Sequence, residues 1–310
     1  MKRKVSFMLA GLLLFGYVAL AQGYTFRVMV TKGDNKVKTA GSTDWQAVRI
    51  GGKLNDGDEI MIAEGGYMGL VHASGKTKEL KSAGTYKVSD LSSELSASSA
   101  NIASKYADYV ISKMSPEERE ANRRKYASVT GAVSRGTEGT INLYMPSSVT
   151  VYNPKVVLRW EPVENASAYE IKLKDLFEQT IMVAESDKPY YVLDLQDPKL
   201  REKVVEGLVI ITVNVKGNED IKSGDAAIEL ASKDEGLPYE VDLQELKANL
   251  NEDSAINSII LAEFYEENNL LLDALTAYEH AIKLEPDVEF YKQAYEDFLM
   301  RQGLKKKEAQ

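Results

Sequence analysis

The sequence contains no cysteine and only two histidines, His72 and His280, in 310 residues. The missing cysteine excludes disulfides, thiolate metal sites, iron–sulfur clusters and cysteine nucleophiles. Because the two histidines lie about 200 residues apart, a histidine-rich zinc or iron site would need a second chain. A Ser-His-Asp triad likewise has only two possible bases. We therefore expect no metal, no cofactor and no catalytic residue.

Long apolar runs are also missing, except at the N-terminus. The basic segment Lys2–Lys4 precedes the uncharged run Val5–Ala21, which ends in a small-x-small site before Gln22. This pattern predicts a signal peptide over residues 1–21, cleaved between Ala21 and Gln22. The alternative is a retained anchor, but the run of 17 residues is shorter than the roughly 20 that a membrane span needs. We expect no stable membrane insertion after cleavage.

The chain has a net charge of −9, which becomes −12 when the three basic residues and no acidic ones leave with residues 1–21. Such a chain repels polyanions on average, so we expect no nucleic-acid partner. The basic run Lys305–Lys307 is interpreted as part of a disordered tail over 305–310. A secreted chain without disulfides favours the envelope of a bacterium with an outer membrane, most simply the periplasm.

Residues 22–92 predict a small all-β domain. Tyr24–Thr31 alternates, with Phe26, Val28 and Val30 on one buried face, and short strands then recur between turn signals at 8–12-residue spacing. The stretches Trp45–Ile60, Gly66–Val71 and Leu80–Val88 resemble the FecR-type periplasmic domain. That family relays outer-membrane signals to a sigma factor. We expect only the β module to be shared, because the family's cytosolic segment and spanning helix have no counterpart here.

Residues 93–136 predict a helical connector. Ala100–Met114 carries apolar residues at three-and-four spacing, which indicates an amphipathic helix. Ser115, Pro116 and Glu118 form a capping box that starts a second helix.

Residues 137–238 predict a β-sandwich. In the strands around Val156–Trp160 and Tyr169–Lys174, alternation points Trp160, Tyr169, Ile171 and Leu173 inward. The tryptophan before Pro162-Val163 and the tyrosine opening the next strand resemble fibronectin type III and immunoglobulin-like domains. Such sandwiches present or bind more often than they catalyse, and the fold alone fixes no function.

Residues 239–304 resemble a tetratricopeptide repeat followed by a capping helix at Asp287–Gln302. The matching positions are Leu261, Ala262, Tyr265, Ala274, Tyr278, Ala281 and Pro286. Small residues allow two helices to cross closely, tyrosines fill the space between them, and the proline ends the second helix. One repeat is below the number that is stable alone, so it should pack on the sandwich or on a partner.

We expect the first helix of this repeat to bind a partner. The positions that line the groove of such repeats correspond to an apolar base with an acidic rim, which suits a basic or amphipathic segment. They are Ile256, Ile259, Glu263, Glu266 and Glu267. The alternatives are a solvated acidic face and a joint covered by the chain's own sandwich.

The sequence therefore predicts a multidomain α+β protein: a small all-β FecR-like domain, a helical connector, a β-sandwich and a terminal helical hairpin with a capping helix. These modules indicate a non-enzymatic envelope adaptor that binds other envelope proteins, in surface signalling or complex assembly. One alternative is a carbohydrate-binding or glycan-processing protein that uses paired carboxylates, which a cleft with two buried carboxylates would favour. The other alternative is a passive structural spacer.

Overall fold

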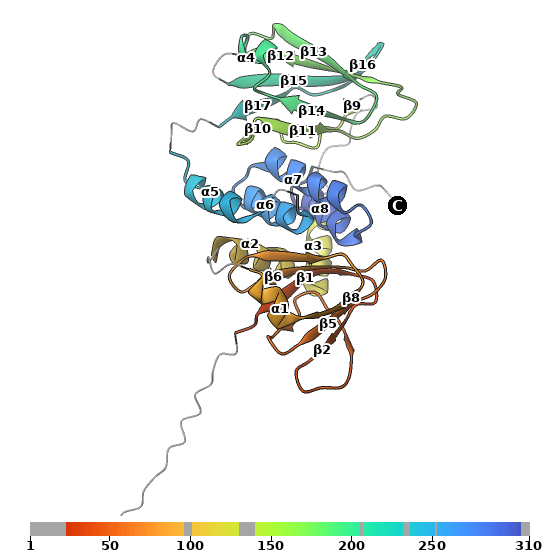
Figure 1. The fold of residues 1–310 in the computed structure, drawn as a ribbon. Coiled ribbons are helices and arrows are strands. Elements are labelled where there is room, and N and C mark those ends of the chain that lie inside the picture. Colours follow the sequence, from red (N-terminus) through yellow and green to blue (C-terminus); the bar gives the residue numbers. More distant parts are fainter. Residues whose placement is uncertain are drawn as a thin grey trace, which may run out of the picture.

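The computed structural model describes residues 23–95, 101–129, 140–204, 207–231, 236–251 and 253–304. The predicted signal peptide with its cleavage site at Ala21 and Gln22 and the predicted tail at 305–310 lie outside these ranges. Within them the chain is mixed α+β, with eight helices and several sheets. Figure 1 shows three layers, with the last helices lying between the N-terminal strands and the strands that follow residue 140. The spatial order of the layers therefore differs from their order in the chain.

The N-terminal part consists of two four-stranded sheets, ordered β4-β1-β6-β7 and β3-β2-β5-β8. Its elements are β1 (Phe26–Lys32), β2 (Lys36–Lys38), β3 (Gln46–Ala47), β4 (Lys53–Leu54), β5 (Glu59–Ile62), β6 (Tyr67–His72), β7 (Thr77–Leu80), β8 (Gly84–Lys87) and α1 (Val88–Ser93). The core of this part includes Phe26, Val28, Ile60 and Leu70. These short strands correspond to the short apolar runs that turn signals separate in the sequence.

Strand β1 differs from the expected strand with one buried face. A β-bulge between Val28 and Val30 shifts the register against β6, and a bulge re-aims the side chains that follow it. Phe26 and Val28 lie in the core of the β part, whereas Met29 and Val30 belong to the core shared with the helices. Both faces of β1 are buried because the helical layer covers the second one.

Two helices connect the β parts, α2 (Asn101–Lys113) and α3 (Pro116–Val129). The Ser115 hydroxyl accepts a hydrogen bond from the Glu118 amide at 3.3 Å, as a capping serine does. Helix α2 packs on the helical layer, where the ring of Tyr106 meets the ring of Phe264 edge-on at 5.2 Å.

The strands after residue 140 form a large sheet with the path β10-β17-β15-β12-β13 and a two-stranded sheet β11-β14. The elements are β9 (Thr140–Ile141), β10 (Ser148–Val151), β11 (Lys155–Arg159), β12 (Tyr169–Lys174), β13 (Thr180–Ser186), β14 (Tyr190–Asp194), α4 (Pro198–Arg201), β15 (Leu208–Val215), β16 (Asn218–Ser223) and β17 (Ala226–Leu230). We call the described residues from 140 to 231 the sandwich, after the fold predicted from the sequence. Trp160, Tyr169, Ile171 and Leu173 are each at most 3% exposed, so their predicted inward direction is confirmed.

The helical layer contains α5 (Glu240–Asn249), α6 (Ala255–Glu267), α7 (Leu271–Leu284) and α8 (Glu289–Arg301). Helices α6 and α7 form a hairpin, and the residues predicted to pack it lie as expected. Ala262, Tyr265, Ala274, Tyr278 and Ala281 are buried, Leu261 is half-buried, and Pro286 follows the end of α7. Helix α8 covers α7, with the rings of Tyr278 and Phe298 stacked at 4.9 Å.

The N-terminal part joins the helical layer at the start of α6. The Glu79 carboxylate on β7 accepts hydrogen bonds from the Ser254 hydroxyl and the Ile256 amide, both at 3.0 Å, where a negative charge suits a helix N-terminus. Gly69 allows the close approach, since a Cβ there would lie 2.6 Å from Val30 Cγ1 and 3.0 Å from Ile256 Cδ1. A side chain at position 69 would therefore require Val30 and Ile256 to shift.

The sandwich joins the opposite side of the layer at the start of α7. The Asp273 carboxylate, which is 1% exposed, accepts hydrogen bonds from the backbone amides of Tyr152 and Asn153, both at 2.8 Å. The Asn153 side chain adds two more, at 2.7 Å to Asp273 and at 3.0 Å to the Tyr265 hydroxyl. The hairpin thus binds both β parts with polar side chains as well as apolar ones.

The face of α6 that was predicted to bind a partner is buried inside the chain. Ile256 and Ile259 are fully buried, Glu263 is 1% exposed and Glu266 is 7% exposed, whereas Glu267 is exposed. The prediction of an open groove on this face is therefore wrong. The cover is the N-terminal sheet and α2, with Arg301 of α8 over Glu266. It is not the sandwich, because the sandwich packs on α7.

Candidate functional site

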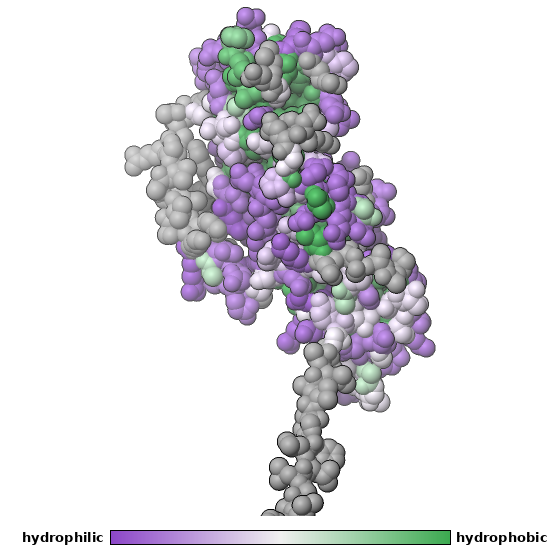
Figure 2. Space-filling model, turned by 90° about the vertical axis from the view of Figure 1, so that its left-hand side faces the viewer, coloured by the Kyte–Doolittle hydropathy of each residue, from purple (hydrophilic) through white to green (hydrophobic). Residues whose placement is uncertain are grey.

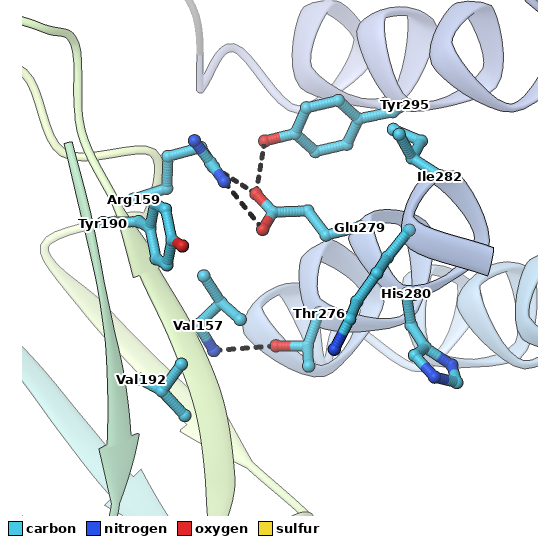
Figure 3. A pocket seen from close by; sticks show the side chains of 10 residues that line it. Val157, Arg159, Tyr190, Val192, Thr276, Glu279, His280, Ile282 and Tyr295 are labelled. Atoms are coloured by element: carbon cyan, nitrogen blue, oxygen red, sulfur yellow. Dashed lines mark hydrogen bonds and ion pairs between the residues drawn. The ribbon is translucent and has the colours of Figure 1, made fainter. Parts of the chain in front are cut away.

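A groove of about 600 Å³ lies between the two-stranded sheet β11-β14 and the helices α7 and α8. Figure 3 shows its labelled side chains, which come from both sides of this junction. The residues that line the groove are Val157 and Arg159 on β11, Tyr190 and Val192 on β14, Thr276, Glu279, His280, Ile282 and Lys283 on α7, and Tyr295 on α8. We call this space the sandwich–helix groove.

An ion pair closes one end of the groove. Arg159 donates from Nε and Nη2 to the two oxygens of Glu279, with 2.9 Å for the Nη2 bond, and the Tyr295 hydroxyl donates to Glu279 Oε1 at 3.1 Å. The guanidinium also lies over the ring of Tyr190, 4.9 Å from its centroid. Burial disfavours the charge of Arg159, but the bonds to Glu279 outweigh it and raise its pKa. Both charges are thus satisfied within the chain.

Most of the surface inside the groove is apolar. The Val157 amide donates to the Thr276 hydroxyl at 2.9 Å, and that hydroxyl donates to the Leu272 carbonyl at 2.7 Å, so the polar groups along β11 are engaged. Val192, which faces Val157 across the β11-β14 pair, is 53% exposed. Helix α7 therefore covers β11 and leaves the β14 side open.

His280 contacts a serine but has no catalytic arrangement. Its Nδ1 lies 3.1 Å from Ser258 Oγ, and the Ser258 hydroxyl donates to the Ser254 carbonyl at 2.9 Å. The ring therefore donates a hydrogen bond to the serine oxygen. A general base would instead accept the proton of the serine hydroxyl. Ser258 is also buried at 4% exposure, which keeps substrates away from its hydroxyl.

A buried pair of carboxylates does exist, on the predicted binding face of α6. Arg301 donates to Glu266 at 2.9 and 2.8 Å, and Lys113 donates to Glu263 and, at 3.2 Å, to Glu267. Burial raises the pKa of Glu263 to about 7. Burial acts in the same direction on Glu266, but the charge and hydrogen bonds of Arg301 hold its pKa below the usual value.

The space beside this pair is too small for a sugar. The void lined by Lys113, Glu263, Tyr278 and Arg301 measures about 10 Å³, which is near the minimum for one water molecule. Glycosidases need their two carboxylates on either side of a sugar ring. The pair therefore joins helices and gives no support to a glycan-processing site.

The remaining histidine has a structural position. His72 Nδ1 lies 2.7 Å from Ser74 Oγ, and its Nε2 lies 3.2 Å from Ser92 Oγ.

In the part of the chain that the structure describes, no three His, Cys, Asp or Glu side chains are grouped so that they could hold a metal ion. None of the described helices has the length and apolar composition of a membrane span.

Exposed apolar side chains are concentrated on the sandwich. Of the seven large apolar residues that are exposed in the described ranges, four belong to it: Leu176, Phe177, Val183 and Val192. Figure 2 shows apolar surface gathered over the sandwich, with mostly hydrophilic residues over the helical layer beneath. Of these four exposed residues, only Val192 lines the sandwich–helix groove.

The sequence contains a weak signal for the groove, which the prediction missed. Thr276, Glu279, His280 and Lys283 follow three-and-four spacing, so they share one face of α7. On β11, Val157 alternates with the buried Val156 and Leu158 and is an apolar residue on the outer side. Neither pattern reveals that the two faces meet, because the contacting residues lie about 120 positions apart.

No protein-family model matches the chain, and no curated protein matches it in sequence. The resemblances to FecR-type, fibronectin type III or immunoglobulin-like, and tetratricopeptide domains therefore stay predictions from the motifs alone.

Proposed function

We propose that the protein is a non-enzymatic adaptor of the bacterial cell envelope, which binds a segment of another protein in the sandwich–helix groove. The observation that supports this most is the chemistry of the lining. Arg159, Glu279 and Thr276 are engaged in bonds within the chain, while Val192 is open to solvent. A catalytic site needs a reactive group that can meet its substrate, whereas a recognition site needs apolar surface with a few polar groups.

The two alternative functions have less support. A spacer has no use for a concave apolar surface, and such surfaces mark interaction sites. A carboxylate-dependent glycan enzyme is disfavoured because Glu263, one of the two buried carboxylates, lines a void of only about 10 Å³. The predicted signal peptide is the basis for placing the adaptor in the envelope, with the periplasm as its proposed compartment.

Site-specific photo-crosslinking in living cells tests this function. A benzophenone amino acid at Val192 should give discrete crosslinks to envelope proteins. The same group at Val241 on α5, which is 77% exposed and does not line the groove, should not give them. A purified partner identified in this way should bind the wild type and bind V192D at least tenfold more weakly. If positions 192 and 241 give the same crosslinks, or V192D binds equally well, the groove is not the binding site.

A further inference from the structure

The charge of the groove differs in sign from the charge of the chain. Glu279 is the one carboxylate among the described lining residues, and Arg159 and Tyr295 engage both of its oxygens. Lys283 lines the same groove and makes no ion pair with a described residue. After the Arg159–Glu279 pair cancels, the lining keeps a positive charge in a protein whose net charge is −9.

A second cation contacts the lining of the groove through the ring of Tyr190. The ammonium of Lys188 lies 5.7 Å from the centroid of the Tyr190 ring, whose other neighbour is Arg159. Tyr190 and the half-exposed Val192 lie on β14, and Lys283 lies on the groove face of α7. The apolar lining thus has one cation within it, on α7, and a second cation beside Tyr190 of β14.

We propose that the partner segment is acidic and carries apolar side chains: its apolar groups pack on Val192 and Ile282, and its carboxylates pair with Lys283 and Lys188. This inference rests on the proposed function and names the chemistry of its partner. A basic segment would meet like charges in the groove, which opposes binding. Lysine suits this role because its ammonium is a mobile point charge that does not require a fixed carboxylate geometry.

Three fluorescein-labelled peptides of twelve residues test the proposal with the full-length protein. They share the same leucines and valines, and their polar positions carry only Glu, only Gln or only Lys. Fluorescence anisotropy should give the Glu peptide a dissociation constant at least tenfold below that of the Lys peptide. K283E should weaken binding of the Glu peptide at least fivefold and reduce the salt dependence of that binding. K292E is the matched control, because Lys292 on α8 does not line the groove and is 46% exposed.

The outcomes separate this inference from the proposed function. If the Lys or Gln peptide binds most tightly and V192D abolishes that binding, the groove binds segments but not acidic ones, and the inference is overturned. If V192D changes the binding of no peptide, both the inference and the groove as a peptide site are overturned. If K292E weakens the Glu peptide as much as K283E does, the attraction belongs to the overall surface and not to the groove.

Discussion

The hydroxyl oxygens of Tyr67 on β6 and Tyr291 on α8 lie 2.7 Å apart, although 224 residues separate them in sequence. Both side chains are buried, at 3% and 0% exposure, and their rings meet edge-on at 6.2 Å. Tyr67 also hydrogen-bonds Glu79, the residue that caps α6. The N-terminal sheet, the start of α6 and the last helix are thus joined by hydrogen bonds through Glu79, Tyr67 and Tyr291.

We expect Y67F to destabilise the protein more than Y291F. Removing the Tyr67 hydroxyl leaves the buried Tyr291 hydroxyl without this partner and takes one of several hydrogen bonds from Glu79, which costs about 1–3 kcal/mol, whereas Y291F leaves the Tyr67–Glu79 bond in place and costs about 1 kcal/mol. The double variant should cost less than the sum of the two single changes. Urea unfolding at pH 7 measures these free energies, with Y109F at a 41%-exposed tyrosine as a control expected to change nothing. Equal costs for all three single variants would contradict the prediction.

The buried Glu263 should make stability depend on pH. Burial raises the pKa of this carboxyl to about 7 from 4.5, so the folded state binds the proton more tightly than the unfolded state. The free energy of unfolding should therefore fall as the pH rises from about 4.5 to 7. At roughly 1.4 kcal/mol per pKa unit, Glu263 contributes up to about 3 kcal/mol of this fall.

The variant E263Q isolates that contribution, because it removes the titrating group and leaves the other carboxyls. Its free energy of unfolding should change less with pH than that of the wild type over this range, when both are measured by urea unfolding at half-unit steps. The control E267Q neutralises Glu267, an exposed carboxylate that also pairs with Lys113. Its free energy of unfolding should depend on pH as that of the wild type does. If E263Q and the wild type have parallel profiles, Glu263 does not titrate in this range.

The ion pair of the groove allows a third prediction. R159M should destabilise the protein by about 1–3 kcal/mol, because Glu279 keeps a half-buried charge without its partner; the pair's partial exposure, 25% and 16%, limits the cost. The double variant R159M/E279M should recover most of that loss, since apolar side chains of similar length replace both charges. Thermal unfolding of the wild type, R159M, E279M and the double variant at pH 7 provides the comparison. A double variant less stable than R159M would show that Glu279 has other essential contacts.

The N-terminus provides a fourth prediction. The segment Val5–Ala21 with its small-x-small end should be removed during export, so the native protein should start at Gln22. Intact-mass measurement of protein released from cells by outer-membrane disruption without detergent should match residues 22–310. A native mass that includes Met1–Ala21 would contradict cleavage and favour a retained anchor.

The sequence alone determined the local structure of elements in which one repeating pattern of apolar residues, helical or alternating, extends along the whole element. Small residues and tyrosines at fixed spacing predicted the α6–α7 packing through Ala262, Tyr265, Ala274 and Tyr278, and alternation predicted the inward side of the strand at Tyr169–Lys174. Ser115 and Glu118 marked the start of α3. These features depend on neighbours within a few turns or one strand, so short-range patterns contain the necessary information.

Only the tertiary structure decided what covers each face. A periodic pattern shows that Ile256 and Ile259 avoid water, but it does not distinguish a partner from the chain's own N-terminal sheet, and here that sheet covers them. The same holds for Val30, which a β-bulge turns toward the helices, and for Glu263, whose partner Lys113 lies 150 residues away. The groove exists because β11 and α7 meet at Thr276 and Glu279. Contacts of that sequence separation arise from the packing of whole layers, which no local period encodes.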